Sequence, residues 1–149
     1  MSYTYQYPRP SLTVDALLFT IKDDAVKILL IQRADDPFKK YWAFPGGFVE
    51  ENETVEDAVV RELFEETGLH GIQLHQLFTA SAPGRDPRGW TVSVIFYGFI
   101  SADEHQPKAG SDARDAVWHS LSNIPQLAFD HREIVQKAQK LLKKELENL

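Results

Sequence analysis

The stretch GFVEENETVEDAVVRELFEETGL, residues 47–69, decides how the chain folds. Thr54 is a good helix N-cap with Asp57 three positions later, and Gly68 is a natural helix stop. Between them, apolar residues recur at helical spacing and predict a core-facing stripe. These residues are Val55, Ala58, Val59 and Leu63. The sequence therefore predicts an amphipathic helix that follows a glycine loop.

Three glutamates, Glu62, Glu65 and Glu66, lie on one side of this helix because their spacing is i, i+3 and i+4. Like charges at this spacing repel each other, and two interpretations follow. The first is a solvated acidic face with Arg61 nearby, which the carboxylates alone favour because such faces are common. The second is a site for a hard cation, since carboxylate oxygens suit Mg²⁺ or Mn²⁺.

The full spacing of this stretch changes that balance. From Gly47, five residues lead to Glu53, and seven more lead to RELFEETGL at residues 61–69. This pattern resembles the Nudix hydrolase signature, G-x5-E-x7-R-E-U-x-E-E-x-G-U with U a bulky aliphatic residue, at every specified position. Three shorter stretches, YPRPSLTVDALLF, WAFPGGFVE and GRDPRG, are similar to the ADP-ribose pyrophosphatase branch. The resemblance covers most of residues 5–119.

The resemblance implies an α/β/α sandwich and hydrolysis of a nucleoside diphosphate linked to another moiety. It makes Glu62 and Glu66 the first metal ligands and Glu65 the third, with the carbonyl of Gly46 or of an adjacent glycine completing the shell around Mg²⁺ or Mn²⁺. Arg61 is expected to orient these glutamates through charge-assisted hydrogen bonds. The signature residues expected to give structural support are Gly47, Glu53 and Gly68, with direct metal ligation as the less favoured alternative for Glu53.

The general base is left open between a signature glutamate and an acidic residue in a later loop. The favoured loop candidate is Asp112, ahead of Asp115 and Glu104. The alternative for Asp112 is a loop residue that bonds its own backbone, as aspartate often does.

Substrate contacts are expected from basic and aromatic side chains in two loops. Arg33 begins the polar loop 33–41, and Arg85 and Arg88 lie in the loop 81–89, where each is either a phosphate contact or a solvated loop residue. Phe38, Trp42 or Tyr7 is expected to stack on an adenine, with core or dimer contacts as the alternative.

The rest of the chain predicts an α+β fold with a mixed β-sheet between helices. Expected strands are 12–21, 26–32, 72–80, 90–100 and 116–119, the first two joined as a hairpin at Asp23-Asp24. Asp130 is expected to cap a last helix, whose buried stripe is Ile134, Ala138, Leu141 and Leu142. Residues 1–10 are expected to dock on the fold as an extended segment, or to serve a dimer or the substrate cleft. Residues 1–149 are expected to form a single Nudix domain.

The composition of the chain limits the classes of ligand and partner that it is expected to bind. A net charge of −6 disfavours nucleic acid and anionic membrane surfaces, and it makes a polyphosphate substrate depend on local basic residues or metal. Absence of cysteine excludes disulfides and thiolate catalysis. No signal-peptide pattern or membrane-spanning apolar run is present, so a cytoplasmic protein is expected. The family resemblance predicts a homodimer.

The substrate favoured by the resemblance is ADP-ribose, cleaved to AMP and ribose 5-phosphate. One feature counts against it: Arg85 occupies a position where some ADP-ribose enzymes have proline, with Pro83 and Pro87 on either side. Alternative substrates are an oxidised nucleoside triphosphate, NADH or a diadenosine polyphosphate, although the array SQPWPFPxS of NADH-type enzymes is absent. A non-catalytic ADP-ribose sensor is a further alternative. Related regulators add a basic DNA-binding domain, which this acidic chain is not expected to have.

Overall fold

The longest strand, β1 (Ser11–Lys22), runs through the middle of a mixed sheet in the computed structural model, which describes residues 2–108 and 113–149. The other strands are β2 (Ala25–Arg33), β3 (Trp42–Ala43), β4 (Gly46–Phe48), β5 (His75–Ala80), β6 (Thr91–Phe99) and β7 (Ala113–Ser120). Their order is β3-β2-β1-β6-β5, while β4 pairs with β1 and β7 pairs with β2. Strand β1 is buried from residue 13 to 20 because it has neighbours on both edges and helices on both faces.

Two pairings set the register of the centre. Strands β1 and β2 form the predicted antiparallel hairpin, with Asp23 and Asp24 in its turn at φ 54° and 60°. Aspartate tolerates this left-handed region better than most residues. On its other edge β1 pairs in parallel with β6, from Ser11–Thr91 to Phe19–Phe99.

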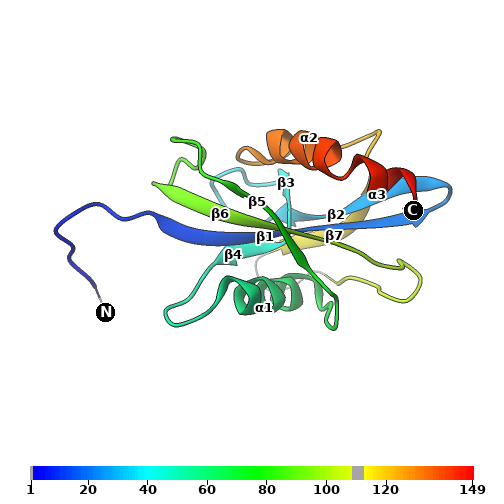
Figure 1. Ribbon diagram of the computed structural model, residues 1–149. Coiled ribbons are helices and arrows are strands. Elements are labelled where there is room, and N and C mark those ends of the chain that lie inside the picture. The colour runs from blue at the N-terminus through cyan, green and yellow to red at the C-terminus, as the bar shows by residue number, and fades with distance from the viewer. Residues whose placement is uncertain (1, 109–112) are drawn as a thin grey trace.

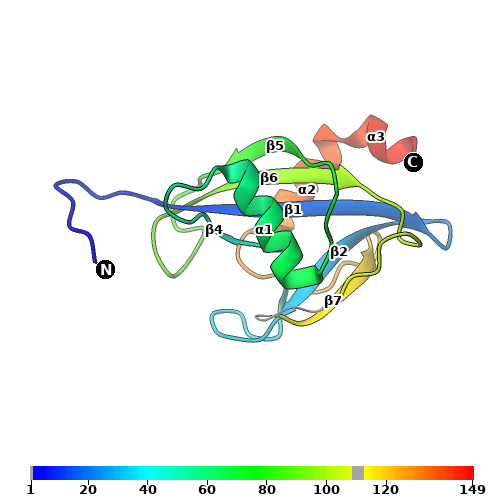
Figure 2. The ribbon, with the colours of Figure 1, turned by 90° about the horizontal axis from the view of Figure 1, so that it is seen from below.

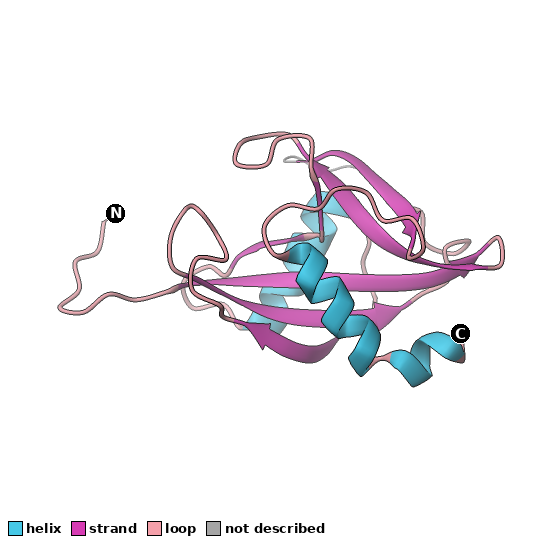
Figure 3. Ribbon diagram, turned by 90° about the horizontal axis from the view of Figure 1, so that it is seen from above, coloured by secondary structure: helices cyan, strands magenta, loops and turns pink. Residues whose placement is uncertain are grey.

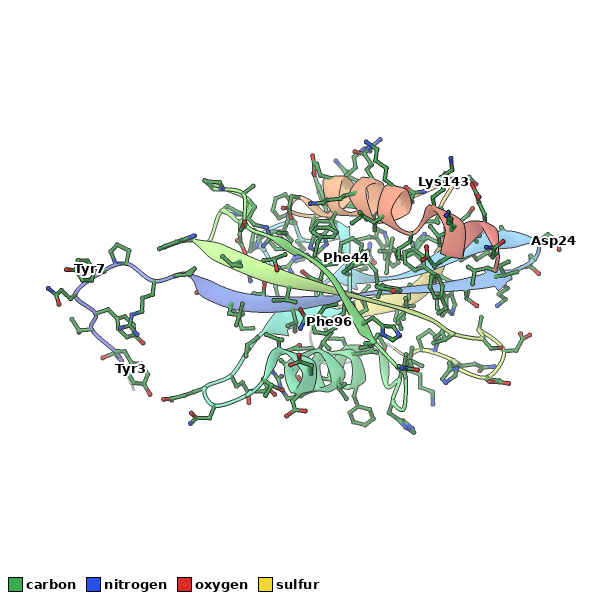
Figure 4. The ribbon with its side chains drawn as sticks, viewed as in Figure 1. Tyr3, Tyr7, Asp24, Phe44, Phe96 and Lys143 are labelled. Atoms are coloured by element: carbon green, nitrogen blue, oxygen red, sulfur yellow. The ribbon has the colours of Figure 1, made fainter. Side chains whose placement is uncertain are left out.

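Helices cover both faces of the sheet: α1 (Val55–Thr67) lies on one face and α2 (His131–Leu141) on the other (Figure 1). Figure 2 shows α1 lying across the strands, and Figure 3 shows α2 from the opposite side. Side chains of β1 alternate between the two layers, as strand geometry requires. Val14, Ala16 and Leu18 pack with α1, whereas Leu17 and Phe19 pack with α2. The labelled Phe96 and Phe44 mark these two layers in Figure 4. The predicted sandwich is confirmed.

Helix α1 begins and ends as its sequence predicts. The Thr54 hydroxyl accepts a hydrogen bond of 3.0 Å from the Asp57 N–H. Gly68 ends the helix at φ 74°, and its N–H donates to the Phe64 carbonyl. Ala58, Val59 and Leu63 are buried, so the core-facing stripe is confirmed.

Other boundaries differ from the prediction. Strand β5 begins at His75 instead of Ile72, and β7 already begins at Ala113. Helix α2 follows Asp130, but the Asp130 side chain makes no cap hydrogen bond because it is paired with Arg85. Leu141 is 51% exposed, so its predicted burial is wrong. A further short helix, α3 (Lys143–Glu147), follows.

The N-terminal segment does not dock on the sheet as expected. Residues 2–10 project away from the body, with Tyr7 71% exposed (Figures 1 and 4). The Tyr3 hydroxyl donates a hydrogen bond of 2.8 Å to Glu51. A role for this segment in a dimer stays a prediction. None of the helices in the described residues has the length and apolar character that a membrane-spanning helix needs.

Candidate active site

A cavity of about 510 Å³ opens beside α1, which is within the usual size of a small-molecule site. Its wall combines acidic side chains from α1 with basic and aromatic side chains from β2, β4, α2 and the loops between strands and helices. The predicted residues that it brings together are Arg33, Gly46, Gly47, Glu62, Glu66, Arg85 and Arg88. Glu65, Phe38 and Trp42 lie outside the cavity.

Strand β4 brings the glycine pair close to the glutamates. A Cβ atom at Gly47 would lie 2.5 Å from the Glu62 carboxyl carbon, and one at Gly46 would lie 2.2 Å from the Val14 carbonyl oxygen. Gly46 is therefore required by its close approach to backbone, whereas a side chain at Gly47 would displace the end of the Glu62 side chain. At Gly47 the atom approached is a carboxylate that lines the cavity.

Arg61 ties the acidic residues of the signature together. Its Nε and Nη2 donate to the two oxygens of Glu53 at 2.7 and 2.9 Å. Its Nη1 donates to Glu62 at 2.8 Å and to Glu65 at 3.2 Å. These bonds hold the pKa of Glu53 at about 2, and they raise the pKa of Arg61. Such contacts are what an orienting role for Arg61 and a supporting role for Glu53 require.

Glu62 and Glu66 form an acidic pair in which Glu66 is buried and Glu62 is half-buried. Burial, followed by the charge of Glu62, raises the pKa of Glu66 to about 9, and burial also raises the pKa of Glu62. Within the described part of the chain, Glu66 Oε2 has no hydrogen-bond partner. A buried carboxylate oxygen without a donor is costly, so this pair favours either a proton or a cation.

The donor set fits a divalent metal. Glu62, Glu66 and the Gly46 carbonyl are hard oxygen donors, and Mg²⁺ commonly uses one or two carboxylates while substrate phosphates and waters complete its shell. In residues 2–108 and 113–149 no group of three acidic or histidine side chains converges to form a metal cage. Glu65, predicted as third ligand, points instead to Arg61 and its side chain is 48% exposed.

The floor of the cavity holds a carboxylate that the sequence analysis missed. Asp15 of β1 is 8% exposed, and its Oδ2 accepts a hydrogen bond of 2.6 Å from the Ser93 hydroxyl of β6. Burial raises the pKa of Asp15 to about 6, against the opposing effects of Ser93 and Arg85. A single acid within an otherwise apolar strand was the available signal.

The two loop arginines have different surroundings. Arg85 Nε and Nη2 both donate to Asp130 at 2.9 Å, and the Arg85 side chain is only 5% exposed. Arg88 pairs with Asp86, and its own side chain is 40% exposed. Arg85 therefore joins the loop to the start of α2, while Arg88 remains accessible. Substrate contact by either residue stays a prediction.

Aromatic residues of the cavity are not those predicted. Phe44, Phe48, Phe129 and His131 line it. Phe38 packs edge-on against Phe129 at 4.9 Å, and Trp42 packs against the His119 ring at 4.5 Å. His131 accepts a hydrogen bond at Nδ1 from the Phe44 N–H, and its burial lowers its pKa to about 3, so it is neutral.

Two of the three loop candidates for the general base lie outside this cavity. Glu104 and Asp115 are exposed residues outside it. Asp115 accepts a hydrogen bond from the Ala116 N–H. Asp112 lies outside the described residues, so its role stays a prediction.

Comparison with known proteins identifies the family. The NUDIX domain model matches residues 10–138. The chain belongs to the Nudix family of hydrolases. ADP-ribose pyrophosphatase of Methanocaldococcus jannaschii is 48% identical over 130 residues, which are 87% of this Nudix chain and 73% of that protein. The ADPR responsive transcriptional repressor NtrR of Acinetobacter baylyi is 37% identical over 89% of this chain, which matches 54% of the repressor's length.

Solved structures agree with this Nudix fold. The NUDIX domain of Shewanella oneidensis NrtR in complex with ADP ribose superimposes with a TM-score of 0.85 at 35% identity, covering 91% of this chain and 90% of that one. A MutT/nudix family protein of Enterococcus faecalis gives a TM-score of 0.84 at 38% identity, covering 96% of this chain and 66% of that one. The predicted Nudix fold is therefore confirmed.

Proposed function

We propose that this Nudix protein hydrolyses ADP-ribose to AMP and ribose 5-phosphate with the help of Mg²⁺ or Mn²⁺. The observation that carries the proposal is the pair Glu62 and Glu66 in a cavity that also contains Arg33 and Arg88. Glu66 is buried, and its Oε2 has no hydrogen-bond partner among the described residues. The pyrophosphatase of M. jannaschii, at 48% identity, supports ADP-ribose as the substrate.

The residues divide the chemical task. A diphosphate resists hydrolysis because its negative oxygens repel nucleophiles, so the site must neutralise charge and activate water. A divalent metal, when held by Glu62, Glu66 and the Gly46 carbonyl, supplies both effects. Arg61 keeps Glu62 turned to the cavity through its hydrogen bond of 2.8 Å. Arg33 and Arg88 provide local positive charge for the phosphates. The overall net charge of −6 would repel them.

A substrate panel in Mg²⁺ tests this function. ADP-ribose, NADH, diadenosine polyphosphate and oxidised dGTP are assayed for release of phosphate-containing products. We expect ADP-ribose to be turned over fastest, and Glu66→Gln to abolish turnover. Glu56→Gln is the matched control, because Glu56 is an exposed residue on the same helix. Faster turnover of another nucleotide would keep the metal site and remove ADP-ribose as the substrate.

A second candidate function is ADP-ribose sensing. The resemblance to NrtR, whose NUDIX domain has been crystallised with ADP ribose, is the observation that favours it. Binding of ADP-ribose without turnover in either Mg²⁺ or Mn²⁺ would support a sensor over an enzyme. Another Shewanella oneidensis NrtR structure contains a 27mer DNA, so duplex DNA is a second ligand to test at physiological salt. DNA binding would contradict the expectation drawn from net charge.

A further inference from the structure

One ring in the cavity lies beneath two guanidinium groups. The Cζ atom of Arg33 is 4.9 Å from the centroid of Phe129, and the Cζ atom of Arg88 is 5.1 Å from it. Both distances are within the range of a cation–π contact. All three side chains line the cavity that contains Glu62 and Glu66.

The two arginines at this ring differ in their ion pairing. Arg88 is paired with Asp86, at 2.8 Å. Arg33 donates from Nε to the Pro37 carbonyl at 2.8 Å, and within residues 2–108 and 113–149 it forms no ion pair with a carboxylate. Burial, followed by the charge of Arg88, lowers the pKa of Arg33. An anion placed between the two guanidiniums would relieve this repulsion.

The backbone of Phe129 is held in an unfavourable conformation. Its φ is 52°, in the left-handed region where glycine or asparagine is preferred. The ring is fixed from its sides by Phe38, at 4.9 Å between centroids, and by His131, at 5.5 Å. Such an outlier in a cavity points to a functional requirement for that side chain.

We propose that Phe129 is a positioning residue: contact with its ring keeps both the Arg33 and the Arg88 guanidinium at one part of the cavity, where they receive two adjacent phosphate groups. The inference rests on the proposed function for the identity of the ligand, a nucleoside diphosphate. Each guanidinium presents a planar fork of donors to phosphate oxygens. Contact with the Phe129 ring restricts both forks before the ligand arrives, and Phe48, whose ring centroid is 5.1 Å from the Arg88 Cζ atom, restricts Arg88 as well. Less side-chain freedom is therefore lost on binding.

The test measures binding without catalysis. Isothermal titration calorimetry in EDTA follows inorganic pyrophosphate and, separately, ADP-ribose. We expect Phe129→Leu to weaken both ligands about 3- to 30-fold, the range of a cation–π contact, and Phe129→Tyr to retain wild-type affinity. Phe78→Leu is the matched control, because Phe78 lies under Lys137 at 4.4 Å in a cation–π pair away from the cavity. It should bind as wild type does.

A second set of variants separates positioning from general packing. Arg33→Lys keeps the charge but loses the planar guanidinium, so we expect it to weaken pyrophosphate binding as Phe129→Leu does. If Phe129→Leu does not fold, Arg33→Lys takes its place in the test. In an Arg33→Ala background, Phe129→Leu should reduce the affinity for pyrophosphate by a smaller factor than in wild type, because the effects of substitutions at coupled residues are not additive. An equal factor in both backgrounds would contradict the inference.

The outcomes also separate this inference from the proposed function. Wild-type affinity in Phe129→Leu, equal weakening in Phe78→Leu, or no pyrophosphate binding by the wild-type protein would each overturn the role of Phe129. Absence of ADP-ribose turnover in Mg²⁺, together with pyrophosphate binding that depends on Phe129, would remove the proposed reaction and keep the phosphate site.

Discussion

Replacing Glu66 with glutamine should make the metal-free protein more stable, by an amount that depends on pH. Glu66 is 7% exposed, and its Oε2 has no hydrogen-bond partner within the described residues. Burial and the neighbouring charge of Glu62 raise its pKa from 4.5 to about 9. Glutamine has nearly the same shape and carries no charge, so it removes this titration from the folded state.

The sign and size of this difference in stability follow from proton linkage. Between pH 4.5 and about 9 the folded state holds a proton on Glu66 that the unfolded state has released, so stability falls as pH rises. Each pH unit in this window is worth about 1.4 kcal/mol. The free energy of unfolding of the wild-type protein, relative to that of Glu66→Gln, should fall by about 1 kcal/mol at pH 5, about 3 kcal/mol at pH 7 and about 5 kcal/mol at pH 8. Below pH 4.5 the difference should not change further with pH.

Urea denaturation in EDTA at these pH values measures the difference directly. The amide of glutamine also needs partners, which adds a constant offset, so the slope against pH is the diagnostic quantity. The exposed control Glu56→Gln should follow the wild-type slope. If the gap between wild type and Glu66→Gln stays constant from pH 5 to pH 8, then Glu66 titrates normally and the argument for a buried, cation-seeking carboxylate fails.

Three other substitutions test separate contacts. In Gly47→Ala the new Cβ would meet the Glu62 carboxyl at 2.5 Å, so turnover in Mg²⁺ should fall about 10- to 100-fold; an unchanged rate would show that Glu62 can move freely. Arg85→Ala leaves Asp130 unpaired and should lower the unfolding free energy in urea by about 3 kcal/mol, whereas a change under 1 kcal/mol would rule out a structural role for that pair. Thr54→Ala removes the helix cap and should reduce stability by about 1 kcal/mol while turnover at 25 °C is retained; a large loss of turnover would place the cap in the catalytic machinery.

Features that depend on local sequence were predicted well. The cap at Thr54, the stop at Gly68 and the buried stripe of α1 all follow from residues within one helix. The hairpin of β1 and β2 also needs contacts only between neighbouring segments. Fixed spacing on one helix likewise located Glu62 and Glu66 beside each other.

Features that depend on distant segments were missed or misplaced. Asp15 contacts Ser93 only because β1 pairs with β6, and the sequence of neither strand alone predicts that pairing. Phe129 lines the cavity with its backbone in the left-handed region, which the sequence does not predict. Phe38, which was predicted to contact the substrate, packs edge-on against the Phe129 ring instead. Asp130 looked like a helix cap, but a buried arginine 45 positions earlier competes for its carboxylate.

The parallel pairing of β1 with β6 also has a consequence for how the molecule assembles. Its partners, from Ser11–Thr91 to Phe19–Phe99, are 80 positions apart, so the pairing closes a loop that contains the whole signature helix. Closing a flexible loop of that length costs about 4 kcal/mol of chain entropy before any contact repays it. During synthesis α1 is made before β6, and contacts of such long range slow folding. The floor of the cavity, where Asp15 meets Ser93, is therefore completed late, and ligand binding by a nascent or refolding chain reports that its topology is closed.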